Sequence, residues 1–266
     1  MAFHYYSALR SKEFAVSTEL KNNMLNYKAC QPEMLLFRRE QSAIIAEEMR
    51  KAKRALLANI PPANDSADGK KANLIMVTSL TGGDGKTFFS WMLSRSLATE
   101  MDRQILLVDA APKIGETARE FSSPFVNHPP CGLMEYLYNT DNRPLSDFVY
   151  QTETPNLRYI AAGSQSAYLA TELFTSQRMS KLLNEFRERY DDRLVVIDGF
   201  PLLGFNESQA LLPLVDHIIV VVDEGAALKS ELVDAIKLLP TDIPVYFVIN
   251  KCVNTNSRWK WLKNTL

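Results

Sequence analysis

A glycine-rich segment, residues 81–87, carries the side chains of this chain best suited to chemistry. It reads Thr-Gly-Gly-Asp-Gly-Lys-Thr and directly follows the apolar run 74–79. Glycines let a loop turn its amides toward phosphate oxygens, and the N-terminus of a following helix adds a favourable dipole. We therefore expect the Lys86 ammonium on nucleotide phosphates and the Thr87 hydroxyl on Mg²⁺. The predicted nucleotide-binding residues here are Gly82, Gly83, Asp84, Gly85, Lys86, Thr87 and Phe88.

Two aspartates stand where such a site needs carboxylates. Asp109 ends the apolar run ILLVD, and Asp198 ends LVVID. The carboxyl ends of parallel strands meet at one edge of a sheet, which is also where a phosphate loop opens. Because Mg²⁺ prefers oxygen ligands, we predict Thr87, Asp109 and Asp198 as its ligands, directly or through water. The predicted catalytic residues are Lys86, Asp109 and Asp198.

A further polar segment follows the last apolar run. It reads Asn-Lys-Cys-Val from Asn250 to Val253. In many GTPases an aspartate at the fourth position of such a segment recognises guanine, and valine cannot accept those hydrogen bonds. The sequence thus favours ATP or ADP over guanine nucleotides, with Asn250 as a base contact. The alternative is a strand-terminal asparagine that caps a turn.

Apolar runs alternate with stretches of helical length and periodicity. Runs as uniformly apolar as these are typical of strands buried on both faces of a parallel sheet. We therefore predict an α/β fold, a mostly parallel sheet flanked by helices on both faces, of the P-loop NTPase type. The expected strands are 74–79, 105–110, 157–162, 194–198, 217–223 and 244–250, and the expected helices between them are 87–101, 176–190 and 228–240.

Composition shifts divide the chain into four predicted parts. Residues 1–60 are expected to form a polar arm followed by a helix from Pro32 to Asn59, and 61–72 a Pro-, Asp- and Gly-containing loop. Residues 73–253 form the nucleotide-binding domain and 254–266 a basic, aromatic tail. That tail suits an interface with a partner or a lipid headgroup layer, or alternatively a terminal helix that docks its tryptophans on the domain.

Net charge, cysteine spacing and hydropathy indicate the compartment of the protein and the partners it lacks. The formal net charge is -1, so no overall field attracts it to nucleic acid. Cys30, Cys131 and Cys252 lack metal-ligand spacing and are expected to be three separate thiols. No apolar run approaches the roughly 18 residues that a membrane span requires. These features predict a cytoplasmic protein without a nucleic-acid partner.

The same motifs resemble those of the bacterial tyrosine kinases that regulate polysaccharide synthesis, which belong to the deviant-Walker P-loop ATPases. Lys86 and Thr87 in GGDGKT, Asp109 in ILLVDA and Asp198 in LVVIDGFP are similar to that family's Walker A, A′ and B motifs. The resemblance covers roughly residues 42–252. It implies a kinase that works with a membrane polysaccharide co-polymerase, at the inner membrane through that partner.

Upstream, Glu47, Arg50 and Lys53 resemble the family's E-x-x-R-x-x-R helix, which implies a homo-oligomer. Partition and division-site ATPases are more distant relatives. They carry a signature lysine where this chain has Thr81.

Other positions depart from the kinase pattern. The second aspartate of the A′ motif, which helps to activate the attacking group, is Ala111 here, and no tyrosine cluster follows Tyr246. The sequence therefore predicts an ATP-binding, kinase-like regulator of capsule or exopolysaccharide synthesis and export with weak or absent kinase activity. The alternatives are an active tyrosine kinase or ATPase, and a positioning ATPase.

Overall fold

The computed structural model describes residues 34–35, 43–60, 71–111, 131–138, 143–163, 169–188, 192–251 and 260–263. They form a sheet with strand order β1-β4-β5-β3-β6-β2-β7-β8-β9. All neighbouring pairs are parallel except β4 with β5 and β8 with β9. The strands are β1 Met34–Leu35, β2 Leu74–Ser79, β3 Gln104–Asp109, β4 Tyr150–Thr152, β5 Leu157–Ile160, β6 Arg193–Asp198, β7 His217–Asp223, β8 Val245–Asn250 and β9 Lys260–Lys263.

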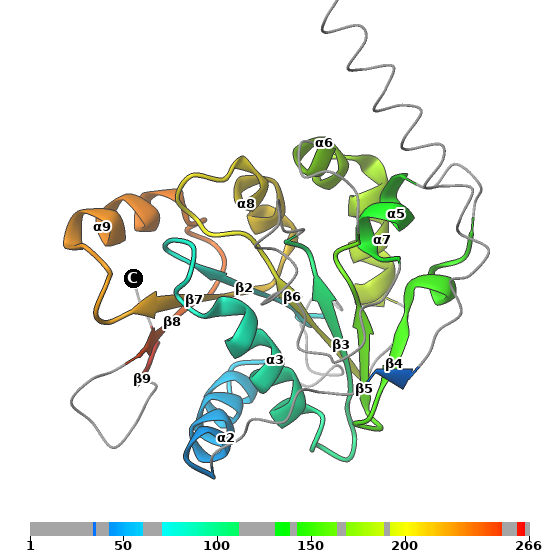
Figure 1. Cartoon of the computed structure of the whole chain (residues 1–266), viewed down its shortest axis with the longest axis horizontal. Coiled ribbons are helices and arrows are strands. Elements are labelled where there is room, and N and C mark those ends of the chain that lie inside the picture. Colours follow the sequence, from blue (N-terminus) through cyan, green and yellow to red (C-terminus); the bar gives the residue numbers. More distant parts are fainter. Residues whose placement is uncertain are drawn as a thin grey trace, which may run out of the picture.

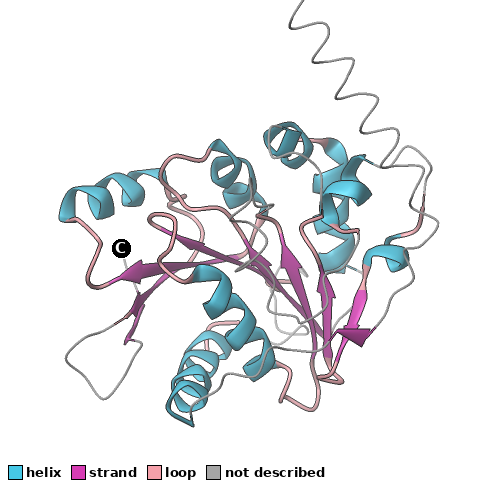
Figure 2. Ribbon diagram, in the orientation of Figure 1, coloured by secondary structure: helices cyan, strands magenta, loops and turns pink. Residues whose placement is uncertain are grey.

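Helices cover both faces of this sheet, as predicted (Figures 1 and 2). Helices α2 and α3 pack on one face, and α5 to α9 belong to the opposite layer. The helices are α2 Ala43–Leu57, α3 Lys86–Leu97, α5 Leu133–Tyr138, α6 Ala170–Phe174, α7 Gln177–Glu188, α8 Asn206–Leu211 and α9 Lys229–Leu238, with 3₁₀ turns η2 Leu145–Phe148 and η4 Leu212–Leu214.

The central strands show why the sheet has two apolar layers. In β2, Ile75 and Val77 belong to the core beneath α2 and α3, whereas Leu74 and Met76 belong to the core beneath the other helices. All four side chains are fully buried. Successive side chains of a strand point to opposite faces, so an uninterrupted apolar run lets one strand contribute to both cores.

Helix α2 is shorter than its predicted span. It begins at Ala43, and Met34–Leu35 instead form β1, which pairs with β4 at one edge of the sheet. Within the helix, Ile45, Met49, Ala52 and Leu56 recur at spacings of four, three and four residues and are buried. This stripe packs α2 against α3 and the sheet.

The expected strand 157–162 ends at Ile160 in the structure. The carbonyls of Ala161 and Ala162 accept hydrogen bonds from the amides of Leu133 and Met134 instead. Those amides lie in the first turn of α5, where a helix has no partners of its own for its N–H groups. The main chain therefore leaves the sheet early to cap a helix.

Two further expectations are wrong. Residues 260–263 form β9, antiparallel to β8, so this part of the tail is not a helix. Cys131 is buried and disulfide-bonded rather than a separate thiol. Among the helices that the structure describes, none has the length and apolar character needed to cross a membrane. The predicted arm, residues 1–32, and almost all of the loop 61–72 lie outside the described residues.

Candidate functional site

The glycine-rich loop connects the carboxyl end of β2 to the N-terminus of α3, as the sequence predicts. Gly83 and Gly85 have φ angles of 94° and 99°, a region that side chains with a Cβ rarely adopt. Gly85 is also the residue before α3, and its carbonyl accepts the first helical hydrogen bond from Phe89 N at 2.9 Å. Together these glycines turn the chain sharply enough for α3 to start at the loop.

Asp84 holds the loop from inside. Its carboxylate accepts hydrogen bonds from the amide of Thr81 at 3.0 Å and from the hydroxyl of Thr81 at 3.1 Å, and the residue is only 4% exposed. This side chain therefore stabilises the conformation of the loop. Its predicted contact with a nucleotide stays a prediction.

Asn250 contacts the same loop from the end of β8. Its side-chain Nδ2 donates to the carbonyl of Asp84 at 2.6 Å, and its Oδ1 accepts from the amide of Lys251 at 2.7 Å. Both ends of the amide are thus bonded within the protein, and the geometry matches the turn-capping alternative. The predicted base contact stays a prediction, and Val253 lies outside the described residues.

Sequence reasoning missed a bridge between Asp223, Lys251 and the loop. The Lys251 ammonium donates to Asp223 Oδ2 at 2.6 Å and to the carbonyl of Gly83 at 3.0 Å. The hydrogen bond from Lys251 lowers the pKa of the Asp223 carboxyl. The only available signal was that β7 and β8 end in Asp and in Asn-Lys at the same edge as the loop.

Asp109 and Asp198 lie side by side, because β3 and β6 pair in parallel with these two residues in register. Asp109 Oδ2 accepts from the hydroxyl of Tyr159 at 3.4 Å, and Asp198 Oδ1 accepts from the hydroxyl of Ser90 at 3.3 Å. Both aspartates are at least 91% buried, with exposed fractions of 9% and 3%. The predicted meeting of the two carboxylates at one sheet edge is therefore present in the fold.

Thr87 joins these carboxylates around a small cavity. Its volume is about 10 Å³, close to the minimum that holds one water-sized particle. Lys86 Nζ donates to the hydroxyl of Thr87, one of the lining residues, at 3.5 Å. The cavity is lined by Thr87, Ser90, Trp91, Leu107, Asp109, Tyr159 and Asp198. Its hydroxyl and carboxylate oxygens are the donor type that Mg²⁺ prefers.

Position 111, where the tyrosine-kinase pattern has its second aspartate, lies next to this cluster. Ala111 is 7% exposed, and its amide donates to Asp109 Oδ1 at 3.1 Å. Two other acids that could replace it by their place in the sequence have partners: Asp84 accepts from Thr81, and Glu207 accepts from Thr171 Oγ1 at 2.9 Å. Each of these two carboxylates is therefore already bonded within the protein, and neither occupies position 111.

The charged residues of α2 divide between the surface and the interior. Glu47 and Arg50 are exposed and pair with each other at one turn of the helix. Lys53 is only 8% exposed and reaches the hydroxyl of Thr99 at 2.9 Å and the carboxylate of Glu100 at 2.5 Å. Lys53 therefore joins α2 to the end of α3 in the same chain, while Glu47 and Arg50 face outward.

A phosphate loop after a central strand, opposite paired strand-end aspartates, defines the class of P-loop proteins. Residues 72–246 match the AAA domain family, and the chain belongs to that family. Its homologues include bacterial tyrosine kinases.

Two curated proteins and one solved structure illustrate the similarity. EpsB of Ralstonia nicotianae, named as a candidate tyrosine-protein kinase, is 28% identical over 243 residues, which cover 91% of this chain and 30% of EpsB. Tyrosine-protein kinase CpsD of Streptococcus agalactiae is 25% identical over 195 residues, 73% of this chain and 81% of CpsD. The BceF tyrosine kinase domain has a TM-score of 0.58 and 28% identity, with 74% of this chain and 72% of that domain covered. The chain thus spans under a third of EpsB.

Proposed function

We propose that this protein is an ATP-binding, tyrosine-kinase-like regulator of capsule or exopolysaccharide synthesis and export, with weak or absent kinase activity. One observation carries the proposal. Lys86, Thr87 and the buried pair Asp109 and Asp198 gather at one sheet edge, whereas Ala111 stands at the base position beside them. Among the described residues, groups suited to holding a nucleotide are therefore present, while position 111 carries no carboxylate that could activate an acceptor.

Each retained group has a distinct role toward ATP or ADP. The Lys86 ammonium offsets phosphate charge, and the loop amides donate to phosphate oxygens. Thr87, Asp109 and Asp198 would hold Mg²⁺, which when bound neutralises charge that develops on the phosphates. Ser90 and Tyr159 donate to the two carboxylates and keep them oriented as acceptors toward the cavity.

Binding is tested by calorimetric titration of the protein with ADP and Mg²⁺. We expect ADP to bind and GDP to bind at least tenfold more weakly, and Lys86→Ala to weaken ADP binding by at least tenfold. Lys237→Ala is the matched control, because Lys237 is an exposed lysine on α9 that pairs with Asp234. Absence of ADP binding to the unaltered protein would refute the nucleotide site.

Catalysis is tested separately, by phosphate release and by antiphosphotyrosine detection. Because position 111 lacks a carboxylate, we expect little turnover, and we expect Ala111→Asp to raise it, since general-base help contributes typically ~10²- to 10⁴-fold. Ala111→Asn is the control, since it has nearly the same volume and no basic carboxylate. Strong autophosphorylation by the unaltered protein would instead support an active kinase.

The proposal also covers the compartment, oligomeric state and membrane partner of the protein. We infer that it resides in the cytoplasm, forms a homo-oligomer and reaches the inner membrane through a membrane polysaccharide co-polymerase. Support comes from its homology to bacterial tyrosine kinases and from the outward-facing pair Glu47 and Arg50. Co-expression with the co-polymerase from the same genome, followed by membrane fractionation, tests the partner. A chain that stays in the supernatant in both conditions would argue against it.

A further inference from the structure

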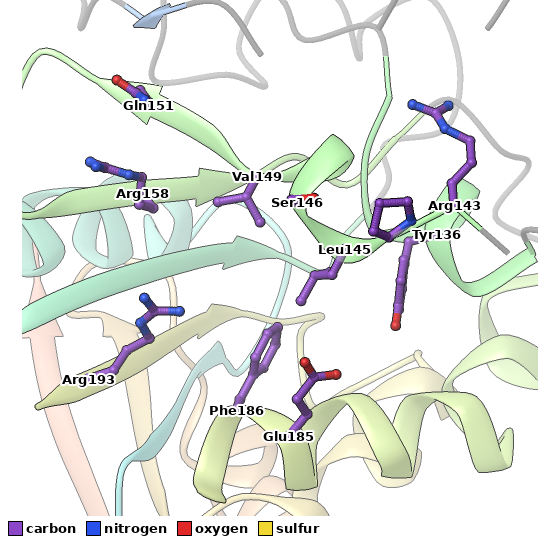
Figure 3. Close-up of a pocket in the computed structure, with 11 residues that line it drawn as sticks. Tyr136, Arg143, Leu145, Ser146, Val149, Gln151, Arg158, Glu185, Phe186 and Arg193 are labelled. Carbon is purple, nitrogen blue, oxygen red and sulfur yellow. The ribbon is translucent and has the colours of Figure 1, made fainter. Parts of the chain in front are cut away.

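A second cleft is lined by residues of α5, α7 and neighbouring strands and by none of the phosphate loop. Figure 3 shows its lining side chains. Its volume is about 640 Å³, within the usual range for sites that hold small molecules. It lies between the α5–η2 segment, the C-terminal part of α7 and the strands β4, β5 and β6. The lining residues are Tyr136, Arg143, Pro144, Leu145, Ser146, Val149, Gln151, Arg158, Glu185, Phe186 and Arg193.

The cleft belongs to the opposite edge of the sheet from the nucleotide site. Arg193 is the first residue of β6, and Asp198, at the nucleotide site, is the last. Arg158 is likewise near the start of β5. A ligand in this cleft would therefore not overlap a nucleotide on the phosphate loop.

Two arginines share one end of the cleft. Arg158 pairs with Leu106 and Arg193 with Gln104, two residues apart on β3, so both arginines lie on the same face on either side of that strand. Figure 3 shows them on one side of the cleft, with Val149, Leu145 and Phe186 leading away from them. Arg158 Nη1 donates to the carbonyl of Pro155 at 3.0 Å, which fixes the guanidinium. A guanidinium has five N–H donors, so such a contact leaves others for a ligand.

The other end has a different chemistry. The Glu185 carboxylate lies beside Phe186 and toward Tyr136, and Arg143 is held at the rim by Asp147 at 3.2 Å and over the Phe148 ring. The guanidinium groups of Arg158 and Arg193 therefore lie together at the opposite end from Glu185. Glu185 supplies the opposing charge among the lining residues. The cleft is therefore polarised along its length.

We propose that this cleft binds a phosphorylated sugar. Guanidinium groups match phosphate oxygens with paired, charge-assisted hydrogen bonds, which assigns the phosphate to Arg158 and Arg193. A carboxylate accepts hydrogen bonds from hydroxyl groups, which assigns the sugar hydroxyls to Glu185. Leu145 and Val149, which are partly exposed in the lining, offer an apolar surface to the C–H face of a sugar ring.

This inference does not depend on nucleotide binding, but its choice of sugar compounds rests on the proposed role in polysaccharide synthesis. A sugar 1-phosphate and a nucleoside diphosphate sugar share the required chemistry, and both are precursors suited to a regulator of polysaccharide synthesis. The volume admits either one. The experiment therefore carries an arm for each.

The test is calorimetric titration of the full chain with glucose 1-phosphate and, separately, with UDP-glucose. We expect at least one to bind, and the double variant Arg158→Gln, Arg193→Gln to weaken it at least tenfold. Arg54→Gln is the matched control, because Arg54 is an exposed arginine on α2. Lys86→Ala should leave binding unchanged, which separates this cleft from the phosphate loop.

A second variant addresses the sugar rather than the phosphate. Glu185→Gln keeps both arginines, so it should weaken the sugar phosphate severalfold and leave inorganic phosphate unchanged or bound more tightly. This variant also serves if the double arginine variant does not fold. The proposal is overturned if neither sugar compound binds the unaltered protein, if inorganic phosphate binds as tightly as both, or if the folded variants bind like the unaltered chain.

Discussion

At the scale of single residues, the phosphate loop depends on contacts that its glycines permit. A Cβ built on Gly85 would lie 2.3 Å from Asn250 Nδ2, which is far inside van der Waals contact. The same Nδ2 donates to the carbonyl of Asp84. Gly85 therefore serves two purposes: it adopts a positive φ angle, and it leaves room for the amide that fixes the loop.

This arrangement predicts different results for two glycine-to-alanine substitutions. Gly85→Ala should destabilise the protein by about 1 to 3 kcal/mol, from the left-handed backbone and the displaced Asn250 side chain, and should weaken ADP binding. Gly82→Ala should change stability by less than about 0.5 kcal/mol, because nothing lies within 4 Å of its Cβ position. Thermal unfolding measures the stability of both variants, and titration with ADP measures their nucleotide binding. Equal effects would contradict a specific role for Gly85.

Residue types and spacing predict part of this site and not the rest. The meeting of Lys86, Asp109 and Asp198 follows from their positions at or just after the carboxyl ends of parallel strands, which share one sheet edge. Each strand end can be recognised from its own stretch of sequence. The partners of Asn250 and Lys251 depend on how the end of β8 approaches a loop more than 150 positions earlier, at separations of 166 and 168 residues. No local pattern encodes such a contact.

At the scale of elements, the bridge from Lys251 ties β7 and β8 to the phosphate loop. Lys251→Ala removes hydrogen bonds to Asp223 and Gly83, so we expect a loss of about 1 kcal/mol in the free energy of unfolding and weaker ADP binding. Lys237→Ala breaks an exposed Lys–Asp pair on α9 and should cost under about 0.5 kcal/mol. Chemical unfolding measures the free energy of unfolding of both variants. An unchanged value for Lys251→Ala would mean that the bridge does not stabilise the protein.

The start of β7 predicts a dependence of stability on pH. His217 is 2% exposed and its Nδ1 lies 3.4 Å from the Tyr246 hydroxyl; burial lowers the pKa of His217, although Asp216 opposes that shift. As pH falls below about 6.5, the unfolded chain takes up a proton that the folded chain resists, so stability falls. His217→Phe should remove this part of the pH dependence. Urea unfolding of both proteins between about pH 5 and pH 8 measures this dependence. Identical profiles for the unaltered protein and His217→Phe would mean that His217 has no role.

Long buried strands are predictable from sequence, and short edge strands are not. The runs at 74–79 and 217–223 coincide with β2 and β7, because both faces of these strands are buried and their residues are uniformly apolar. Strands β1, β4 and β9 have two to four residues and lie toward the edges of the sheet. Such strands form where a neighbouring strand offers unpaired main-chain groups, and their own side chains carry little signal.

At the scale of the whole molecule, the sheet separates two chemistries. The phosphate loop and the paired aspartates lie at the carboxyl ends of the strands. The arginine-containing cleft lies near the amino ends of β5 and β6. The layers of α2 with α3 and of α5 to α9 are packed on different faces of the same strands. A parallel sheet thus gives one chain two sites that can be tested independently.

The remaining prediction concerns assembly through α2. Sequence resemblance grouped Glu47, Arg50 and Lys53, yet the fold separates them: Lys53 is buried against Thr99 and Glu100, and only Glu47 and Arg50 are available to another chain. Arg50→Glu should therefore lower the mass measured by light scattering toward that of a single chain. Its unfolding free energy should change by less than about 0.5 kcal/mol, as is usual for exposed pairs within a helix.

Lys53→Met gives the contrasting result that makes the test specific. It removes the ammonium that joins α2 to α3 and leaves Glu100 without that partner, so it should lower stability by about 1 to 3 kcal/mol. At temperatures where it stays folded, its mass should match the unaltered protein, because Glu47 and Arg50 still face outward. If the unaltered protein is oligomeric and Arg50→Glu leaves its mass unchanged, the interface lies elsewhere. Dissociation by Lys53→Met alone would mean that α2 must be held on α3 before it can meet a neighbour.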